Sequence, residues 1–352
     1  MAKLLIVDGN SLLFRAYYAT IKAARMTTKD GTPTNAVFNF ANMFQKAIDE
    51  IEPDAVMVAF DAGKHTFRHD IYPEYKGGRK ETPEDLKPQF QLVRDMLDAM
   101  NVVWMEKPDI EADDLIGTTS KISDDYHTYI LTNDKDMLQL IDDTTNVLLM
   151  KTGISEMMDM DEEKLMEVME VTPAQIIDLK GLSGDKSDNI PGIVGVGDVT
   201  AKKLLKEYGD VENILAHADE LKGALQTKVM EGKEDALLSK QLATIRRDIP
   251  LDFDLEDLKF HPNYKSLIQF LRALDMNKLS ERFEKYLDEE DEDIVLPKRD
   301  VSLIQKVPKE IYKKEVAIFI NDDLNHFMKA KVLNLTVVPF AKYSPSVLRN
   351  VA

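Results

Sequence analysis

Short apolar runs alternate with longer amphipathic segments along the first half of the chain. Apolar residues recur at helical spacing over Pro33–Ile51 and Pro83–Met100. Three other apolar runs are too short for helices and suit buried strands: Leu4–Val7, Ala55–Phe60 and Thr128–Leu131. Strands that alternate with helices are typical of βαβ units. The pattern predicts an α/β fold over residues 1–172, with a mostly parallel central sheet and flanking helices.

Each of the three predicted strands leads to an aspartate. Asp8 and Asp61 follow their strands directly, and Asp134 follows the third strand after two intervening residues. An open parallel sheet binds its ligands beyond the carboxyl ends of its strands, so we expect these three side chains to meet on one rim. Alone, each aspartate is also typical of a turn or a helix cap. Their expected convergence favours a functional site.

Further acids join this rim from Asp136 and from two clusters, Glu111–Asp114 and Asp185–Asp188. In the first cluster the acids at i and i+3 share one helical face, which turns Asp113 aside; the alternative is that these acids only complement a helix dipole. The expected metal-binding acids are Asp8, Asp61, Glu111, Asp113, Asp114, Asp134, Asp136, Asp185 and Asp188. Carboxylates at this density repel one another. We therefore expect two or more Mg²⁺ ions roughly 4 Å apart, with Mn²⁺ as a substitute.

The second half of the chain has a different pattern. From Pro173 to about Tyr286 amphipathic helices broken by glycine and proline replace the strands, which predicts a helical region over residues 173–287. The acidic run Asp288–Asp293 predicts a solvated linker over residues 288–299. Two further apolar runs, Glu315–Ile320 and Val332–Val338, predict strands in a short tail over residues 300–352.

A glycine-rich stretch, Ile190–Leu205, opens a helix in the second region. Glycines allow backbone N–H groups to approach phosphates, and the positive end of a helix adds to the attraction. A dinucleotide-binding loop is excluded because no strand precedes the glycines. We expect a helix-hairpin-helix that holds duplex backbone, and a plain loop between helices is the alternative. The residues that would contact DNA are Gly192, Gly195, Gly197, Lys202 and Lys203.

A basic segment follows Asp61 and interleaves cations with the aromatic residues Phe67, Tyr72 and Tyr75. Its cations and histidines are Lys64, His65, Arg68, His69, Lys76, Arg79, Lys80 and Lys87. Phosphate-neutralising cations beside base-stacking aromatics favour a channel for single-stranded nucleic acid. The alternative is a solvated loop, since acids also occur in this segment. The two histidines are expected at the surface or on phosphate, not on metal.

Composition limits these interpretations. The net charge of −18 argues at first against a nucleic-acid partner, but the acidic linker and the carboxylate rim account for much of it. The chain has no cysteine, so disulfides and thiolate metal sites are excluded. No apolar run approaches the roughly 18 residues of a membrane span. We expect a cytoplasmic protein without a membrane partner.

With these residues, the chain resembles the 5′-nuclease domain of bacterial DNA polymerase I, in the flap endonuclease superfamily. The matching motifs, in family order, are Leu5–Asn10, Phe60–Asp61, Tyr75–Arg79, Glu111–Asp114, Asn133–Asp136 and Gly184–Gly192. The resemblance covers about residues 1–290. It implies that the nine acids named above match the family's metal ligands.

The resemblance also implies roles for basic residues. Arg15, Lys76 and Arg79 would contact phosphate near the scissile bond, beneath a helical arch over about residues 64–90 that the free 5′ strand threads. The helix-hairpin-helix would carry a K⁺ ion. Residues 300–352 resemble the start of the exonuclease-like domain that follows in the polymerase, truncated and without proofreading activity. Whether the chain is a natural short nuclease or a fragment is left open.

The resulting hypothesis is a Mg²⁺-dependent 5′-3′ exonuclease and structure-specific 5′-flap endonuclease. Lys76, Arg79, Asp113 and Asp134 would carry the chemistry. The resemblance implies DNA with 5′ flaps, nicks or free 5′ ends, including RNA-primed DNA, as substrate in replication and repair, and a monomeric bacterial protein near the nucleoid. One alternative is a branched-DNA-binding module without catalysis. Another is a phosphatase of small esters, which would have no use for the hairpin.

Overall fold

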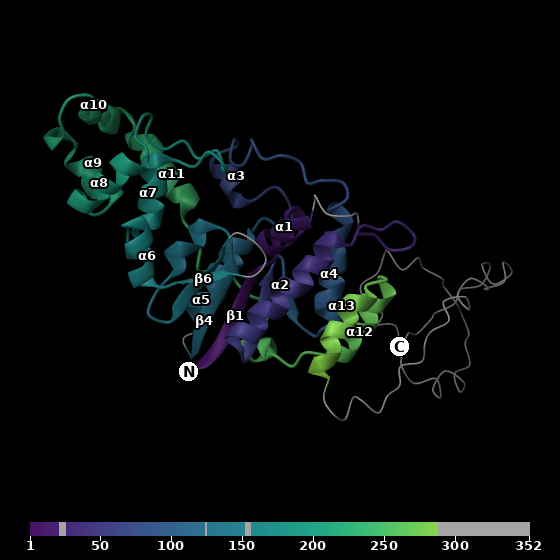
Figure 1. The fold of residues 1–352 in the computed structure, drawn as a ribbon. Coiled ribbons are helices and arrows are strands. Elements are labelled where there is room, and N and C mark those ends of the chain that lie inside the picture. Colours follow the sequence, from purple (N-terminus) through teal and green to yellow (C-terminus); the bar gives the residue numbers. More distant parts are fainter. Residues whose placement is uncertain (21–25, 124, 152–155, 288–352) are drawn as a thin grey trace, which may run out of the picture. The chain divides into compact units, whose positions relative to one another are not determined.

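A six-stranded sheet forms the centre of the computed structural model, which describes residues 1–20, 26–123, 125–151 and 156–287 (Figure 1). The strand order is β3-β2-β1-β4-β5-β6, and only β5 and β6 pair antiparallel. The strands are β1 (Ala2–Asp8), β2 (Ala55–Ala59), β3 (Val103–Met105), β4 (Tyr126–Thr132), β5 (Thr145–Met150) and β6 (Met157–Met160). This confirms the predicted mostly parallel sheet.

Strands β1 and β2 are apolar on both faces because helices cover both. In β1 every residue from Leu4 to Val7 is fully buried, and β2 is buried throughout. This is the usual composition of a parallel sheet between helical layers. The register pairs Asp8 with Ala59 and Val7 with Leu131, so the carboxyl ends of β1, β2 and β4 lie level.

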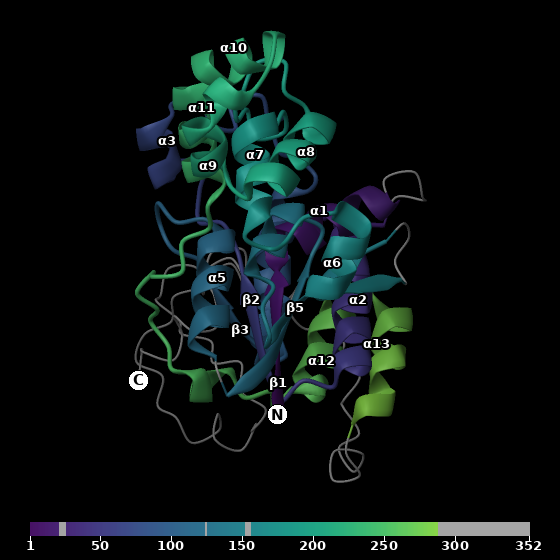
Figure 2. The ribbon, with the colours of Figure 1, turned by 90° about the vertical axis from the view of Figure 1, so that its left-hand side faces the viewer.

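Helices pack on both faces of the sheet (Figure 2). One face is covered by α5 (Ala112–Ile122), which contacts β1 and β2. The other face is covered by α1 (Gly9–Thr20) and α2 (Asn35–Ile51), with α4 (Lys87–Ala99) packed against α2. Two short helices also occur in this part of the chain. The five-residue α3 (Phe67–Ile71) lies between β2 and α4 in the sequence, and the 3-10 helix η1 (Lys135–Leu140) follows β4.

A helical region follows the sheet and packs beyond the carboxyl ends of its strands (Figure 2). Its elements are α6 (Glu162–Met169), α7 (Gln175–Ser183), α8 (Asp198–Tyr208), α9 (Val211–Ala216), η2 (Ala218–Glu220), α10 (Ala224–Glu231) and α11 (Lys233–Ala243). The apolar core is continuous from the sheet into these helices, since Ile130, Leu182 and Ala236 belong to one buried cluster. The helical region is thereby held against the rim where the aspartates lie.

The chain then returns past the sheet through η3 (Leu255–Leu258), α12 (Tyr264–Ala273) and α13 (Asn277–Phe283), and α12 packs on α4. By its internal contacts the chain forms one unit over residues 1–283 and a second over 284–352. Of the second unit, the structure describes only residues 284–287, with η4 (Glu284–Tyr286). The predicted linker (288–299), the tail (300–352) and its two strands lie outside the described residues.

The sequence pattern located the long elements and missed the short ones. The expected strands near residues 4, 55 and 128, the helices corresponding to α2 and α4, and the helical second half are confirmed. Three strands were not predicted: β3 and β6 are short strands at the two edges of the sheet, whereas β5 has six residues and lies inside it. No helix within the described part of the chain is long and apolar enough to span a membrane.

Candidate active site

The three strand-end aspartates meet on one rim, as the sequence predicts. Asp8 ends β1, Asp61 lies two residues beyond β2, and Asp134 lies two residues beyond β4. The charges of Asp61 and Asp134 both act on the carboxyl of Asp8. Level parallel strands thus bring residues from distant parts of the sequence to one place.

Asp8 is the most enclosed member of this group, at 4% exposure. Its Oδ1 accepts a hydrogen bond from Ser11 N–H at 2.9 Å, and its Oδ2 accepts one from the Thr132 hydroxyl at 2.8 Å. Burial raises the pKa of Asp8 to about 7, and the charges of Asp61 and Asp134 add to the rise. At neutral pH this carboxyl is therefore poised between its two protonation states.

Asp61 is fixed by hydrogen bonds from two other elements. Asn10 Nδ2 donates to its Oδ2 at 2.7 Å, and Ala112 N–H at the start of α5 donates to its Oδ1 at 2.8 Å. Burial raises the pKa of Asp61, with a further contribution from Glu111. The side chain therefore has a fixed orientation at the rim.

Asp113 differs from its expected orientation. The i, i+3 spacing of Glu111 and Asp114 predicted that Asp113 points away from the other acids. Its carboxyl instead lies among Asp134, Asp8 and Glu111. Burial, together with the charges of these acids, raises the pKa of Asp113 well above the ordinary value. The expectation failed because Glu111 is the N-cap of α5 and has extended backbone angles, so it does not follow helical spacing. Asp113 thus belongs with the strand-end aspartates.

Thr132 joins two of these acids and was not singled out from the sequence. Its buried hydroxyl donates to Asp8 Oδ2 at 2.8 Å and accepts from Asp134 N–H at 2.9 Å. Asp134 then caps η1 through a hydrogen bond from Asp136 N–H to its Oδ1, at 2.9 Å. A polar residue at the end of an apolar strand is the one sequence feature that marks Thr132.

Glu111 and Asp188 are paired with the basic segment. Lys76 Nζ lies 2.9 Å from Glu111 Oε2 and 3.9 Å from Asp188 Oδ2, and Arg79 Nη2 lies 2.6 Å from Asp188 Oδ1. Burial opposes the charge of Glu111, yet Lys76 and Arg68 outweigh it and lower the pKa of Glu111. The same acids raise the pKa of Lys76 against the effect of its burial. These cations are therefore held at the edge of the carboxylate group.

Arg68 has a structural role that the basic segment did not predict. It is 2% exposed and forms a two-pronged pair with Asp114, at 2.7 and 2.9 Å. Asp114 is fully buried and also accepts from Arg246 N–H at 2.8 Å. Arg68 is thus not available to a channel, and the structure does not bring Asp114 to the open rim.

The aromatic residues of the basic segment also differ from expectation. Tyr75 is 4% exposed and packs with Ile190 and Leu242, so its ring is not free to stack on a base. Its hydroxyl lies 3.3 Å from Glu111 Oε2 and 3.4 Å from Asp188 Oδ2. Within the expected arch, helix is limited to α3 and the first residues of α4, and the chain between them forms turns at residues 73–78 and 84–86. Lys80 in this segment is exposed.

Asp136 and Asp185 share one cation, Lys180 of α7. Lys180 Nζ lies 2.6 Å from Asp136 Oδ1 and also pairs with Asp185, which accepts from Ser187 N–H at 2.7 Å. Burial, with the charge of Asp134, raises the pKa of Asp136 to about 6. Lys180 and Ser187 overcome burial and lower the pKa of Asp185 to about 2. The helical region is thus tied to the rim by an ion pair.

The acids of the rim form two groups, those that pair with a lysine or arginine and those that do not. Among the residues that the structure describes, no lysine or arginine nitrogen lies within 4.0 Å of a carboxylate oxygen of Asp8, Asp61, Asp113 or Asp134. Nor, in the described part of the chain, are three acids or histidines placed closely enough to hold a metal as they stand. The oxygen-only donors, and the raised pKa values of Asp8, Asp61 and Asp113, nevertheless fit a hard divalent cation, which would stabilise the charged carboxylates that burial disfavours.

The glycine-rich stretch connects α7 to α8 by a compact turn. Gly192 has φ of +62°, and a Cβ there would lie 2.2 Å from Gly184 N, so only glycine fits. Gly195 also has positive φ and accepts at its carbonyl from Lys228 Nζ at 3.2 Å, while Gly197 directly precedes α8. Lys203 in α8 is exposed, and Lys202 is half-buried. Helix, glycine turn and helix are present as predicted.

Arg15 lies on the other side of the rim from the basic segment. Its Nη1 donates to Asn133 Oδ1 at 2.8 Å, and burial lowers its pKa. Asn133 N–H in turn donates to Ser11 Oγ at 2.9 Å. This connects Arg15 in α1 to the segment that carries Asp134.

Comparison with known families gives two adjoining matches. Residues 3–170 match the model of the 5′-3′ exonuclease N-terminal resolvase-like domain, and residues 171–266 match that of the 5′-3′ exonuclease C-terminal SAM fold. The chain is 38% identical over 340 residues to DNA polymerase I of Bacillus caldotenax and of Bacillus subtilis, and 42% identical over 284 residues to that of Streptococcus pneumoniae. The first two matches cover 96% of this chain but 38% of each relative, so the chain spans less than two fifths of these proteins.

Solved structures show the same fold. T5 5′-exonuclease with bound zinc aligns with a TM-score of 0.58 at 23% identity, over 81% of this chain and 97% of that one. The catalytic core of Rad2 with a DNA substrate aligns with a TM-score of 0.50 at 15% identity, over 80% and 91% of the two chains. At these identities the likeness concerns the fold.

Proposed function

The chain belongs to the 5′-3′ exonuclease family, and from this premise we propose that it hydrolyses phosphodiester bonds of DNA near a free or flapped 5′ end. It acts both as a 5′-3′ exonuclease and as a structure-specific 5′-flap endonuclease. The observation that carries the proposal is the rim at the carboxyl ends of β1, β2 and β4, where buried carboxylates without cation partners lie beside Lys76 and Arg79. Residues 1–172 form the catalytic region and residues 173–287 the helical region.

Asp8, Asp61, Asp113 and Asp134 are the residues that would hold divalent metal. Burial opposes the ionisation of Asp8, Asp61 and Asp113, and a bound cation is the partner that reverses this effect. When bound, two Mg²⁺ ions supply an activated water nucleophile and neutralise charge on the phosphate. Mn²⁺ would substitute, and the zinc bound in T5 5′-exonuclease supports a divalent site in this fold.

The ion-paired acids hold the cations that receive the substrate. Lys76 and Arg79 rest on Glu111 and Asp188, so a phosphate that approaches the rim meets both cations in place. They offset the negative charge that develops on the phosphate during hydrolysis. The other acids expected at the metal site have cation partners in this structure: Glu111 and Asp188 hold Lys76 and Arg79, Asp136 and Asp185 hold Lys180, and Asp114 holds Arg68.

DNA is held through its backbone on both sides of the cleavage point. The glycine turn at Gly192, Gly195 and Gly197, with Lys202 and Lys203 in the following helix, holds duplex phosphates and carries K⁺. Arg15 and Lys80 contact the backbone near the rim. Because the contacts proposed here are to the DNA backbone, we expect the enzyme to select DNA shape over base sequence.

The substrates are DNA with 5′ flaps, nicks or free 5′ ends, including RNA-primed DNA. The enzyme acts in replication and repair as a monomer in the bacterial cytoplasm, near the nucleoid. The family and the DNA polymerase I relatives support this role. The DNA substrate bound by Rad2, a protein of the same fold, supports a DNA partner.

Cleavage of a duplex with a single-stranded 5′ flap, labelled at its 5′ end, tests the proposal. With Mg²⁺ we expect release of the flap near the junction, and with EDTA we expect binding without product. A 3′-flap duplex with blocked 5′ ends is the matched control, and its flap should stay attached. Binding without cleavage in Mg²⁺ and Mn²⁺ would instead identify a non-catalytic branched-DNA-binding module.

A further inference from the structure

A second basic site lies beside the rim, at the edge of the sheet formed by β5 and β6. It is an open pocket of about 490 Å³, lined by Arg15, Asn133, Lys135, Leu149, Met150, Lys151 and Met158. Of these described lining residues none is acidic, and three carry a positive charge. Its volume is in the range of pockets that hold small organic ligands.

The pocket is connected to the carboxylates by short links. Asn133, in its wall, directly precedes Asp134 and donates its backbone N–H to Ser11 Oγ at 2.9 Å. Ser11 N–H donates to Asp8 Oδ1 at 2.9 Å. One wall of the pocket is therefore fixed to the same hydrogen bonds that orient the rim, and a ligand there lies next to the reacting group.

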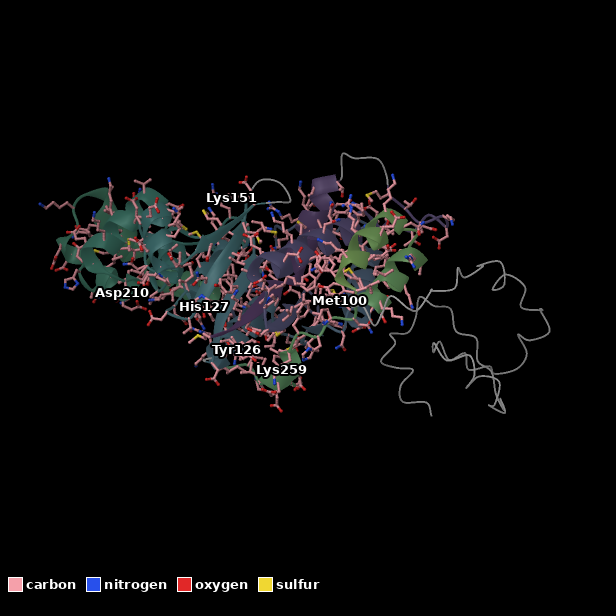
Figure 3. All side chains as sticks on the ribbon, turned by 60° about the horizontal axis from the view of Figure 1, so that its bottom comes forward. Met100, Tyr126, His127, Lys151, Asp210 and Lys259 are labelled. Atoms are coloured by element: carbon pink, nitrogen blue, oxygen red, sulfur yellow. The ribbon has the colours of Figure 1, made fainter. Side chains whose placement is uncertain are left out.

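The pocket lysines lack the partners that other rim cations have. Within the described residues, neither Lys135 nor Lys151 has a carboxylate oxygen within 4.0 Å, whereas Lys76 is paired with Glu111. Both pocket lysines are exposed. Figure 3 places Lys151 at the opposite end of the sheet from Tyr126, which begins β4. Two unpaired ammonium groups at the rim favour an anionic ligand.

The remaining lining is apolar and rich in sulfur. Met150, Met158 and Leu149 form a face on which a flat ring packs, and thioethers contact aromatic rings favourably. Cations beside such a face suit a nucleotide, whose phosphate and base need the two kinds of surface. Lys76 and Arg79 flank the carboxylates from the α5 side, so the rim has cations on two sides.

We propose that this pocket binds one nucleotide of the DNA strand beside the scissile phosphate, through a phosphate on Lys135 and Lys151 and a base on Met150 and Met158. The inference rests on the proposed function and adds to it a second substrate subsite. DNA that crosses the rim is thereby held on both sides of the reacting bond. The subsite sets which phosphate of the strand lies over the carboxylates.

The double variant Lys135→Gln/Lys151→Gln tests the subsite. Its binding to a fluorescent 5′-flap duplex, in EDTA and over a series of KCl concentrations, is compared with that of the wild type. Each lost phosphate contact should reduce the slope of log affinity against log salt by about 0.7–0.9. In Mg²⁺ we expect KM to rise at least about tenfold, with cleavage spread over neighbouring phosphates.

The matched control is Lys259→Gln/Lys278→Gln, which removes the same charge from exposed lysines away from the pocket, with Lys259 at the far end of the sheet (Figure 3). It should keep the wild-type slope and cleavage position. If wild type cleaves the flap and the pocket variant keeps the wild-type slope of log affinity against log salt, the subsite is overturned and the proposed function stands. If wild type shows no Mg²⁺-dependent cleavage, the proposed function is overturned. If free thymidine monophosphate, at a concentration equal to the wild-type KM for DNA, competes with the DNA, the pocket would instead be a site for mononucleotides.

Discussion

The carboxylates of the rim form two groups that differ in what neutralises them. Asp8, Asp61 and Asp113 are buried against other acids, and their pKa values are raised. Glu111 and Asp188 lie at similar depth but rest on Lys76 and Arg79, and the pKa of Glu111 is lowered. Burial alone therefore does not decide the charge of an acid. A cation at ion-pair distance decides it, and among the described residues the first group has none; Lys76 acts on Asp61 and Asp113 only from farther away.

This difference explains how one site can both hold metal and stay folded without it. The paired acids keep their charge through the protein's own cations, while the unpaired acids relieve repulsion by taking up protons. Asp136 lies between the groups, because it pairs with Lys180 and still has a pKa near 6. A bound cation should therefore change the protonation of the unpaired acids more than that of the paired acids.

The largest expected effect is on catalysis. Asp134→Ala should lower flap cleavage by at least about a thousandfold, because a ligand of the group that stabilises the transition state is lost. DNA binding in EDTA should change little. The control Asp143→Ala removes an exposed acid from the turn between η1 and β5 and should cleave normally. Wild-type turnover by Asp134→Ala would remove this residue from the mechanism.

The second-largest expected effect is on folding stability and tests the ion-paired acids. Asp114→Asn should lower the free energy of unfolding by about 3–5 kcal/mol, because buried Arg68 would lose its two-pronged charge partner and keep only Glu111, at 3.3 Å. Urea denaturation measures this. A double-mutant cycle with Arg68→Gln should show strong coupling between the two positions. Independent effects of the two substitutions would contradict a structural role for Asp114.

The metal-free protein should lose stability as the pH rises from about 4 to 7. In this window the unfolded chain has released the proton of Asp8, whose ordinary pKa is 3.8, while the folded protein still holds it because the pKa is about 7. Each unit of that difference contributes about 1.4 kcal/mol. Asp185 has the opposite effect on stability. Because its pKa is lowered to about 2, its contribution is lost as the pH falls, and only below about pH 4.

Thermal unfolding in EDTA at pH 5 and pH 7.5 measures this dependence. The melting temperature should be higher at pH 5, and Mg²⁺ should raise it most at pH 7.5. The variant Asp8→Asn should flatten part of the profile, because it removes one of the acids whose pKa is raised. A melting temperature that rises with pH in EDTA would show that the strand-end acids are not held in their protonated form.

The smallest effect concerns Thr132, which orients Asp8 and Asp134. Thr132→Val keeps the shape but removes the hydroxyl, and we expect metal affinity to fall about 10–100-fold, the usual cost of losing a group that positions a ligand. Thr132→Ser should restore most of the affinity. Mg²⁺ titration by calorimetry measures both. Equal affinity in wild type and the valine variant would leave Thr132 a packing residue.

Much of this arrangement follows from the sequence, because strand ends are easy to locate in an apolar pattern. The apolar runs before Asp8, Asp61 and Asp134 predicted both the sheet and the rim. The glycine run predicted the turn before α8, since positive φ at Gly192 requires that residue. These features depend on local sequence and on the parallel arrangement of strands.

Other features depend on partners far away in the sequence. Arg68 belongs to a basic segment by its neighbours, but Asp114 and the carbonyls of Leu242 and Thr244 hold it in the core. The orientation of Asp113 depended on where α5 begins, which spacing alone does not fix. The pocket beside β5 and β6 could not be predicted because neither strand was. Long-range pairing is what the linear pattern lacks.

Metal binding by two adjacent residues tests the central claim most directly. Free Mn²⁺ would be followed by electron paramagnetic resonance while it is titrated into wild type, Asp113→Asn and Asp114→Asn, with circular dichroism to confirm folding. We predict that Asp113→Asn binds fewer or weaker Mn²⁺ ions than wild type, whereas folded Asp114→Asn binds as wild type does. Wild-type binding by Asp113→Asn would contradict the division of the rim into unpaired metal ligands and ion-paired structural acids.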